Sequence, residues 1–417
     1  IASQSFCFLL EFAHQHNPHI VEKITEPAFE NHSNRLHLAN YSLRQLNIID
    51  QPNTGGGGKY SCVSKMLNQA VTPMGKRKFN EMLFHPITNV DALTNEYNIV
   101  EYCLEEYHNL EKYVAPQLSC IRDVSKIFRF MTHRRTSPSH FFQLFDTLQY
   151  IEEIICYIKT DKTLTDYFDN LQKDVIVVEK TCKDMSQFIR KHFDLDVAKT
   201  METQQLDSNF INKQINIKLD KMTETLQNDN DKLESIREYF NVLLERKEKK
   251  SAPKKQEYFK VHVTEKTHLT LIGTEKRCEL LKSCFGDNEE IVKLSLKDNQ
   301  LYNFTMSNKL LNFHKQNSSG NTFLHPEIND VCKSIFLIKT NMKEVINETF
   351  QNIIQNFINT YEEQLHTIID VVSTIDILLC KAKLARIYNL SKPVIDKSTT
   401  KSFVDAKELR HILIEHI

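Results

Sequence analysis

The sequence predicts a mainly α protein, with a helical core and two long antiparallel helices that carry a small β-containing module at their tip. Three observations support this fold class. Neither glycine nor proline occurs from Ser139 to Ala252 or from Glu327 to Lys392, and such tracts favour helix. Hydrophobic residues recur at steps of three or four within both tracts. Between the tracts, the pattern changes to the alternation typical of strands.

Composition limits the possible functions. The chain has 417 residues, of which 41% are apolar, so it can form two or three domains with hydrophobic cores. Its 53 basic and 54 acidic residues nearly cancel, so any DNA contact must come from a local basic patch. The ten cysteines form no C-x-x-C, and the 17 histidines form no H-E-x-x-H. We therefore expect no metal site and a reducing intracellular compartment.

Residues 61–89 predict two helices joined by a tight corner. Thr72–Gly75 interrupts the first apolar pattern at a point where threonine can cap and proline can occupy the first turn of a new helix. The second helix should stop before Pro86. Its apolar side consists of Phe79, Met82 and Leu83. On its own, this pattern predicts a helix-turn-helix corner in a helical core.

The C-terminal tract contains a hydrophobic stripe with the period of a straight helix. Eleven residues span 36 positions in ten steps, an average of 3.6. At 1.5 Å per residue the stripe is roughly 54 Å long, so we expect a partner helix of similar length. The stripe consists of Ile346, Phe350, Ile353, Phe357, Tyr361, Leu365, Ile368, Val372, Ile375, Leu379 and Ala382.

The partner helix is expected in the earlier tract, with Asn230 as a polar gap in its seam. Each buried seam residue contributes ~1.5 to 3 kcal/mol, which comparable ordering entropy offsets, so neither helix should be stable alone. The seam consists of Ile211, Ile215, Leu219, Met222, Leu226, Leu233, Ile236, Phe240 and Leu244.

Strands are expected between the two long helices. Residues 257–265 place Phe259, Val261 and Val263 on one face, and Leu269 and Leu271 alternate before a glycine. Two further strands are suggested by Ile291, Leu294 and Leu296 and then by Leu301 and Phe304. These strands form the small β-containing module.

The corner in residues 61–89 resembles the core domain of MutS-type DNA mismatch repair proteins. The residues that match its motif are Leu67, Asn68, Thr72, Met74, Gly75, Arg77, Leu83 and Pro86. Upstream, residues 36–49 are similar to the family's lead-in to the core, with Leu38, Asn40, Leu43 and Leu46 in place. Residues 276–282 and the asparagine-rich composition look most like a divergent branch found in large DNA viruses and some mitochondria.

Further motifs extend the resemblance over nearly the whole chain. The first is Ile121–Val124 with Arg129, and the second is Asp376 within a helix motif at residues 373–385. The third is Tyr388–Pro393 followed by Leu409-Arg410-His411, and together these two segments resemble the family's approach to the nucleotide-binding domain. Three residues depart from the family pattern. They are Glu96 in place of an arginine, Cys380 in place of a small residue and Ile412 in place of a proline.

The resemblance implies a division of the chain into named parts. Residues 1–35 would end a connector domain and 36–207 would form the helical core. Residues 208–252 would be the ascending lever helix, 253–326 the clamp, 327–390 the descending lever helix and 391–417 the lead into an ATPase domain that lies outside these residues. Because the chain starts without methionine and ends inside a motif, we expect it to be a piece of a longer protein.

A basic segment near the module predicts contact with double-stranded DNA. Residues 245–282 contain eleven Lys or Arg and six Asp or Glu, an excess of 11 − 6 = +5. The alternative is a solvated hinge. The resemblance to a clamp favours DNA, with backbone contacts that give affinity without reading sequence. The candidates are Arg246, Lys247, Lys249, Lys250, Lys254, Lys255, Lys276, Arg277, Lys282, Lys309 and Lys315.

Other kinds of site are not expected. Residues 55–61 are glycine-rich before Lys59, but the P-loop positions are filled by Asn53 and Tyr60, so a linker is favoured. We find no catalytic constellation, and we expect Asp376 to make a hydrogen bond between packed helices. Residues 6–13 are apolar but interrupted and too short to span a bilayer, so no membrane contact is expected.

The resemblance implies the DNA-binding core and clamp of a mismatch repair ATPase. ATP and Mg²⁺ would bind only in the complete protein, which would form a homodimer or heterodimer mostly through other domains. Cytoplasm, nucleus, mitochondrion and virus remain open as its source. Two alternatives also remain: a coiled-coil protein scaffold, and an arm of a recombination or chromosome-structure ATPase.

Overall fold

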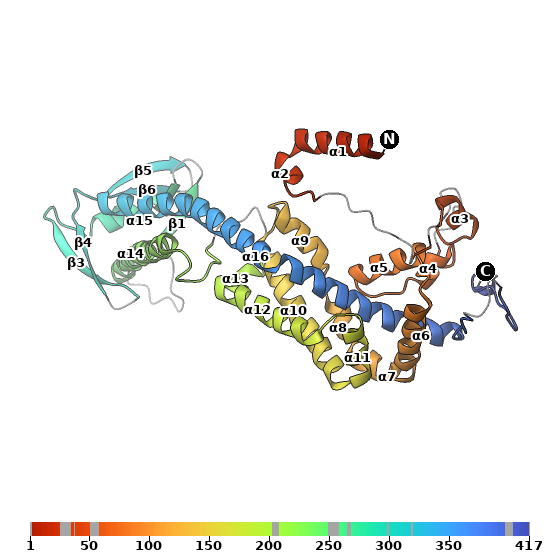
Figure 1. Ribbon diagram of the computed structural model, residues 1–417. Helices are drawn as coiled ribbons and strands as arrows, with labels where there is room; N and C mark the ends of the chain where they lie inside the picture. Colours follow the sequence, from red (N-terminus) through yellow and green to blue (C-terminus); the bar gives the residue numbers. More distant parts are fainter. Residues whose placement is uncertain are drawn as a thin grey trace. The chain divides into compact units, whose positions relative to one another are not determined.

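A computed structural model describes residues 2–25, 35–36, 38–50, 58–201, 208–248, 258–264, 268–297, 300–317, 320–396 and 403–416 (Figure 1). The chain forms two compact units. Unit 1 comprises residues 1–71, 75–111 and 375–417, and unit 2 comprises residues 72–74 and 112–374. Helices predominate, and small antiparallel sheets lie in one part of unit 2. The predicted mainly α fold class is confirmed.

The predicted corner is present in unit 1. Helix α4 (Val63–Leu67) is followed by α5 (Pro73–Phe84), which starts on the expected proline. Their apolar sides meet the C-terminal part of α16 (Pro326–Tyr388) in a core of Met66, Ala70, Phe79, Ile377, Cys380, Leu384, Tyr388 and Leu413. The other α-helices that begin in the described part of unit 1 are α1 (Ala2–His16), α2 (Pro18–Val21), α3 (Asn40–Gln45), α6 (Val90–Glu105) and α7 (Tyr107–Tyr113).

A group of helices in unit 2 packs along α16. Phe141 lies at its centre, with ring centroids 4.7 Å from Phe193, 5.9 Å from Phe350 and 5.6 Å from Phe357. Such aromatic pairs add stabilisation beyond the area they bury. The helices of this group are α8 (Ala115–Cys120), α9 (Val124–Thr132), α10 (Pro138–Thr160), α11 (Lys162–Asn170), α12 (Val175–His192) and α13 (Leu195–Ala198).

The two long helices differ in length. Helix α16 has 63 residues, and α14 (Ile217–Glu248) has 32. The expectation of a partner of similar length was wrong, because α10 and α12 supply the aromatic partners of Phe350 and Phe357. Helix α14 also starts later than its apolar pattern suggests. The side chain of Asn216 caps it by accepting from the backbone N–H groups of residues 218 and 219 at 3.0 and 3.3 Å.

Two of the predicted seam residues therefore lie outside the helix. Ile211 is buried because it forms a β-bridge with Phe193, and Ile215 lies just before the cap. Asn230, predicted as the polar gap in the seam, is exposed. Its neighbours Asp229 and Asp231 are buried instead.

The module contains more strands than predicted. The first sheet has the order β1-β2-β6-β5, and β3 and β4 form a separate hairpin. The predicted strands are confirmed as β1 (Lys260–Thr264), β2 (His268–Gly273), β3 (Glu290–Ser295) and β4 (Leu301–Met306). Three elements of the module were not predicted from the sequence: α15 (Glu275–Lys282), β5 (Asn312–Asn317) and β6 (Gly320–Leu324).

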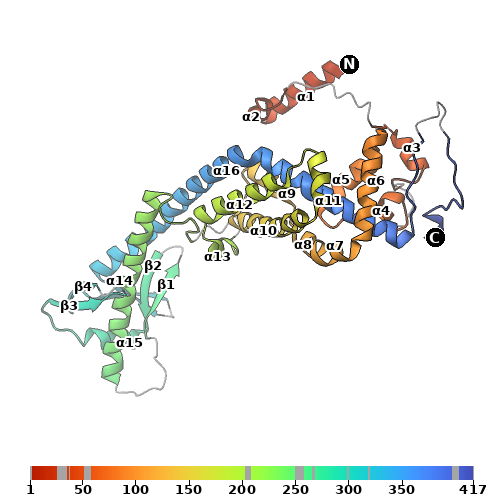
Figure 2. The ribbon, with the colours of Figure 1, turned by 60° about the horizontal axis from the view of Figure 1, so that its bottom comes forward.

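The module is built around α14, which passes between its two sheets in Figure 2. Phe240 of α14 is fully buried, with its ring 6.2 Å from Phe259, 6.1 Å from Phe304 and 5.6 Å from Phe323. Gly273 is required by this packing, because a Cβ there would lie 2.5 Å from the Phe259 ring. The helix and both sheets therefore share one core.

All ten cysteines lie in the described residues, and none of them is in a disulfide bond. Within the described ranges, no helix is both long and apolar enough to cross a membrane. The same residues contain no group of three His, Cys, Asp or Glu side chains placed to hold a metal ion.

Candidate nucleic-acid interface

Helix α15 is the element around which the described candidate residues gather. It begins after Thr274, buries Cys278 and Leu281 against the module core, and ends at Lys282. This one-sided burial leaves the other positions of its two turns available for charged residues. Lys276 on this helix is exposed and Lys282 is half-buried.

The last turn of α14 lies beside the C-terminal end of α15. Lys247 Nζ donates to the carbonyl oxygen of Ser283 at 3.4 Å. Arg246 and Lys247 are both exposed. These two residues and Lys282 therefore bring three basic side chains to one end of α15, although 35 positions separate Lys247 from Lys282 in the sequence.

Lys309 lies near the same end of α15. The backbone N–H of Asn308 donates to the carbonyl oxygen of Gly286 at 2.9 Å, which fixes the turn between β4 and β5 beside the loop after α15. Lys309 is the next residue and is exposed. A fourth basic residue thus lies in a turn that is bonded to the loop after α15, and we call Arg246, Lys247, Lys282 and Lys309 the basic cluster.

The candidates at the other end of α15 have partners within the protein. The Arg277 guanidinium lies over the ring of Tyr258, 4.8 Å from its centroid, in a cation–π contact. Lys315 Nζ lies 3.7 Å from Glu275 Oε2. Both members of that ion pair are more than half exposed, so it adds little stability and can rearrange. Lys276 and Lys315 remain accessible here, whereas Arg277 is engaged in packing.

Four candidates, Lys249, Lys250, Lys254 and Lys255, lie outside the described residues. The seven described candidates were visible in the sequence as basic residues. Their arrangement around α15 was not predicted, because α15 itself was not predicted. The signal for this helix was weak: a threonine before two apolar residues three positions apart. Chemically, the basic cluster provides ammonium and guanidinium donors of the kind that bind phosphate oxygens.

The core motif has a precise geometry in unit 1. The Asp376 carboxylate is buried, and its Oδ1 accepts from the backbone N–H of Val71 at 2.9 Å. A Cβ placed on Gly75 would overlap Oδ2 of the same carboxylate. The glycine therefore makes room for the aspartate, and the predicted hydrogen bond between packed segments is confirmed.

A family model described as MutS domain III matches residues 41–382, which are most of the chain. The chain belongs to the MutS family.

Individual MutS-family relatives agree with this result. The chain is 23% identical over 423 residues to a DNA mismatch repair mutS homologue of Acanthamoeba polyphaga mimivirus, covering 100% of this chain and 36% of the relative. It is 24% identical to DNA mismatch repair protein MutS of Thermotoga neapolitana, covering 82% of this chain and 36% of the relative. A shorter match, 23% identical over 94 residues, is to DNA mismatch repair protein MSH2 of Saccharomyces cerevisiae. The chain spans about a third of the length of the first two relatives.

The positions that depart from the MutS pattern have local explanations. Glu96 forms an ion pair with Lys381. Cys380 is buried beside the carbonyl oxygen of Leu67, and burial raises the pKa of its thiol to about 11, so it remains a neutral packing group. Ile412 packs against the apolar core of unit 1. The substitutions are therefore accommodated by local packing and pairing.

The other MutS-like motifs also have structural roles. Asp123 caps α9 by accepting from the backbone N–H of Lys126 at 3.2 Å. Arg410 donates through Nη2 to the carbonyl oxygens of Tyr388 and Asn389 at 2.8 and 3.0 Å. This interaction ties the segment after α16 to the last turn of that helix.

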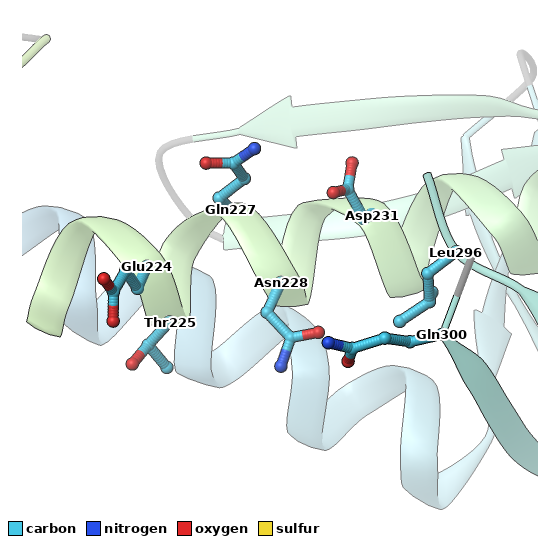
Figure 3. A pocket seen from close by; sticks show the side chains of 7 residues that line it. All are labelled: Glu224, Thr225, Gln227, Asn228, Asp231, Leu296 and Gln300. Atoms are coloured by element: carbon cyan, nitrogen blue, oxygen red, sulfur yellow. The ribbon is translucent and has the colours of Figure 1, made fainter. Parts of the chain in front are cut away.

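A separate polar groove of about 320 Å³ lies on α14 (Figure 3). Its carboxylates, Glu224 and Asp231, would repel phosphate groups. Asp231 pairs with Lys297 at 3.3 Å. Among the described residues, this MutS-family chain therefore presents an acidic groove on α14 and a separate basic cluster, and of these two surfaces the basic cluster has the charge that attracts phosphate groups. The groove is lined by Glu224, Thr225, Gln227, Asn228, Asp231, Leu296 and Gln300.

Proposed function

We propose that this chain is the DNA-binding core and clamp region of a MutS-like mismatch repair ATPase. In this proposal the basic cluster holds the backbone of a DNA duplex, and α14 and α16 act as levers connected to a nucleotide-binding domain. Membership of the MutS family supports the general assignment. The gathering of Arg246, Lys247, Lys282 and Lys309 at one end of α15 is the observation that carries the DNA contact.

The expected contact is electrostatic and independent of sequence. Lys and Arg side chains neutralise phosphates and release counterions, so the logarithm of the affinity falls with the logarithm of salt concentration by about 0.9 per phosphate contact. The cluster lies in a chain whose net charge is −1, so no general field should attract DNA. Affinity should therefore depend on the cluster and not on total charge.

The proposal extends to the complete protein. ATP and Mg²⁺ would bind in a nucleotide-binding domain that follows Arg410-His411, because the motif at these residues resembles the approach to that domain. The complete protein would act as a homodimer or heterodimer. We assign mismatch recognition to a base-probing domain outside this chain.

Fluorescence anisotropy with a short homoduplex and a duplex of equal length containing one mismatch tests the proposal. The chain should bind both duplexes with equal affinity and with the same log-linear loss of affinity across a salt series. Absence of binding at low salt would favour a protein scaffold instead. Tighter binding to the mismatch would contradict the assignment of mismatch reading to another domain.

A further inference from the structure

The seam between the two long helices does not by itself define one register. Apolar residues recur on both helices at steps of three or four, so a shift of one helix by a turn, about 5.4 Å, places apolar residues opposite apolar residues again. Buried Leu219 and Leu233 of α14 and Met342 and Ile346 of α16 illustrate the repetition. Polar contacts across the seam can therefore select one register among those that the apolar spacing allows.

Two such contacts exist, about 13 residues apart along α14. Asn216 Nδ2 donates to Thr349 Oγ1 at 2.7 Å. Ser334 Oγ donates to Asp229 Oδ2 at 2.6 Å, and Lys232 Nζ donates to the other carboxylate oxygen at 3.0 Å. We call the two interhelix contacts the polar pins.

The polar pins can be satisfied together in only one register. A one-turn shift would separate both donors from both acceptors. Asp229 has only 6% of its surface exposed, so its carboxylate would lose the Ser334 hydroxyl in a place where water cannot replace it fully. Buried polar groups of this kind can specify the register of paired helices at some cost in stability.

The β3–β4 hairpin ties the same two helices together. Ser235 Oγ of α14 donates to the carbonyl oxygen of Ser295 at 3.1 Å. On the other side, Glu327 of α16 accepts from Tyr302 Oη at 2.8 Å and from the backbone N–H of Thr305 at 3.2 Å. Sliding of one helix along the other would therefore also break the contacts of one strand of the hairpin.

We propose that the polar pins and the hairpin lock α14 and residues 326–349 of α16 into a single register, so that the pair and the module turn as one rigid body and cannot slide. The lock itself rests on the contacts of unit 2 alone. Its use as a lever rests on the proposed function. If the two helices move, the lock allows them to rotate as one rigid body and prevents a shear motion in which one helix slides along the other.

Distance measurement by pulsed electron paramagnetic resonance tests the lock in the whole chain. Nitroxide labels are attached through a noncanonical amino acid at Lys218 and Lys333, which are exposed on the two helices. The test variant combines Asp229→Leu, Ser334→Ala and Thr349→Val, which remove the polar pins, with Ser235→Ala and Glu327→Ala, which remove the contacts of both helices with the hairpin. It keeps Asn216, whose side chain caps α14. The control is Asn230→Leu, a change to the same residue type at the exposed position next to Asp229.

The unaltered chain and the control should each give one narrow distance. The test variant should give a second distance between the two labels, which differs from the first because one helix has shifted along the other by about one helical turn. A single unchanged distance in a folded test variant, judged by circular dichroism, would overturn the proposal, as would two distances in the unaltered chain. If the test variant does not fold, it is replaced by a variant that keeps Asp229 and combines Ser334→Ala, Thr349→Val, Ser235→Ala and Glu327→Ala. In that variant a broadened distance distribution supports the lock, and an unchanged distribution contradicts it. DNA is absent throughout, so failure here is distinguishable from failure of the clamp assignment.

Discussion

At the scale of single residues, the core motif is explained by one steric and polar arrangement. Asp376 needs a backbone N–H donor because it is buried, and Val71 supplies it at 2.9 Å. Gly75 leaves the space that the carboxylate occupies. The hydrogen bond of Asp376 was predictable from the sequence but its donor was not, because residues 71 and 376 are brought together only by the fold.

Gly75→Ala should lower the free energy of unfolding by about 1 to 3 kcal/mol, because the added methyl group overlaps the Asp376 carboxylate. Urea unfolding monitored by circular dichroism measures the change. Gly286→Ala is the matched control, since a Cβ there meets no atom within 4 Å. Equal midpoints for the two variants would show that Asp376 moves aside without cost.

His325 should make the module sensitive to acid. Burial is the main cause that lowers its pKa below the ordinary value of 6.5, and the Glu327 carboxylate partly opposes this. The unfolded chain therefore binds a proton more readily than the folded one, so stability is complete above about pH 6.5 and is lost as the pH falls below it. Thermal unfolding from pH 7.5 to 5.5 should show a smaller loss for His325→Leu than for the unaltered chain. His314→Leu, at an exposed position of β5, is the control and should retain the full loss.

At the scale of elements, strongly patterned segments were predictable and weakly patterned ones were not. Strand β1 and the start of β2 alternate between apolar and polar residues, and β3 and β4 are rich in apolar residues, whereas β5 carries His314 and Lys315 in succession and has one large apolar residue. The start of α14 was predicted too early because Ile211 fits the helical spacing, although it is buried by a bridge to Phe193 instead. The basic residues were visible in the sequence, but only the position of α15 brings them together.

Phe240→Ala should destabilise the whole β-containing module and not α14 alone. Its ring contacts aromatic residues from both sheets, so the cavity should cost about 3 to 5 kcal/mol. Hydrogen exchange should rise in β1, β2, β4 and β6 together. Val242→Ala, two positions away and 42% exposed, should leave exchange in these strands unchanged. A rise confined to residues 236–244 would contradict a shared core.

At the scale of the whole molecule, each unit has its own hydrophobic core, and α16 contributes residues to both. The resemblance of motifs along the chain predicted the MutS family correctly, because those motifs reflect packing constraints that persist at 23% identity. The proposed DNA contact depends instead on lysines and arginines of which Lys282 alone is half-buried and the others are exposed, so they contribute little to the hydrophobic cores. Packing therefore places few constraints on them, and their role must be tested by binding.

The most direct test is the salt dependence of duplex binding by Lys247→Gln/Lys282→Gln/Lys309→Gln. A matched variant with the same change in net charge carries Lys162→Gln, Lys180→Gln and Lys191→Gln, at exposed positions on the helices of unit 2. The cluster variant should bind more weakly, and the slope of log affinity against log salt should flatten by about 0.9 for each phosphate that the variant no longer neutralises. The matched variant should keep the original slope. Equal slopes for the two variants would contradict a phosphate-binding cluster at the end of α15.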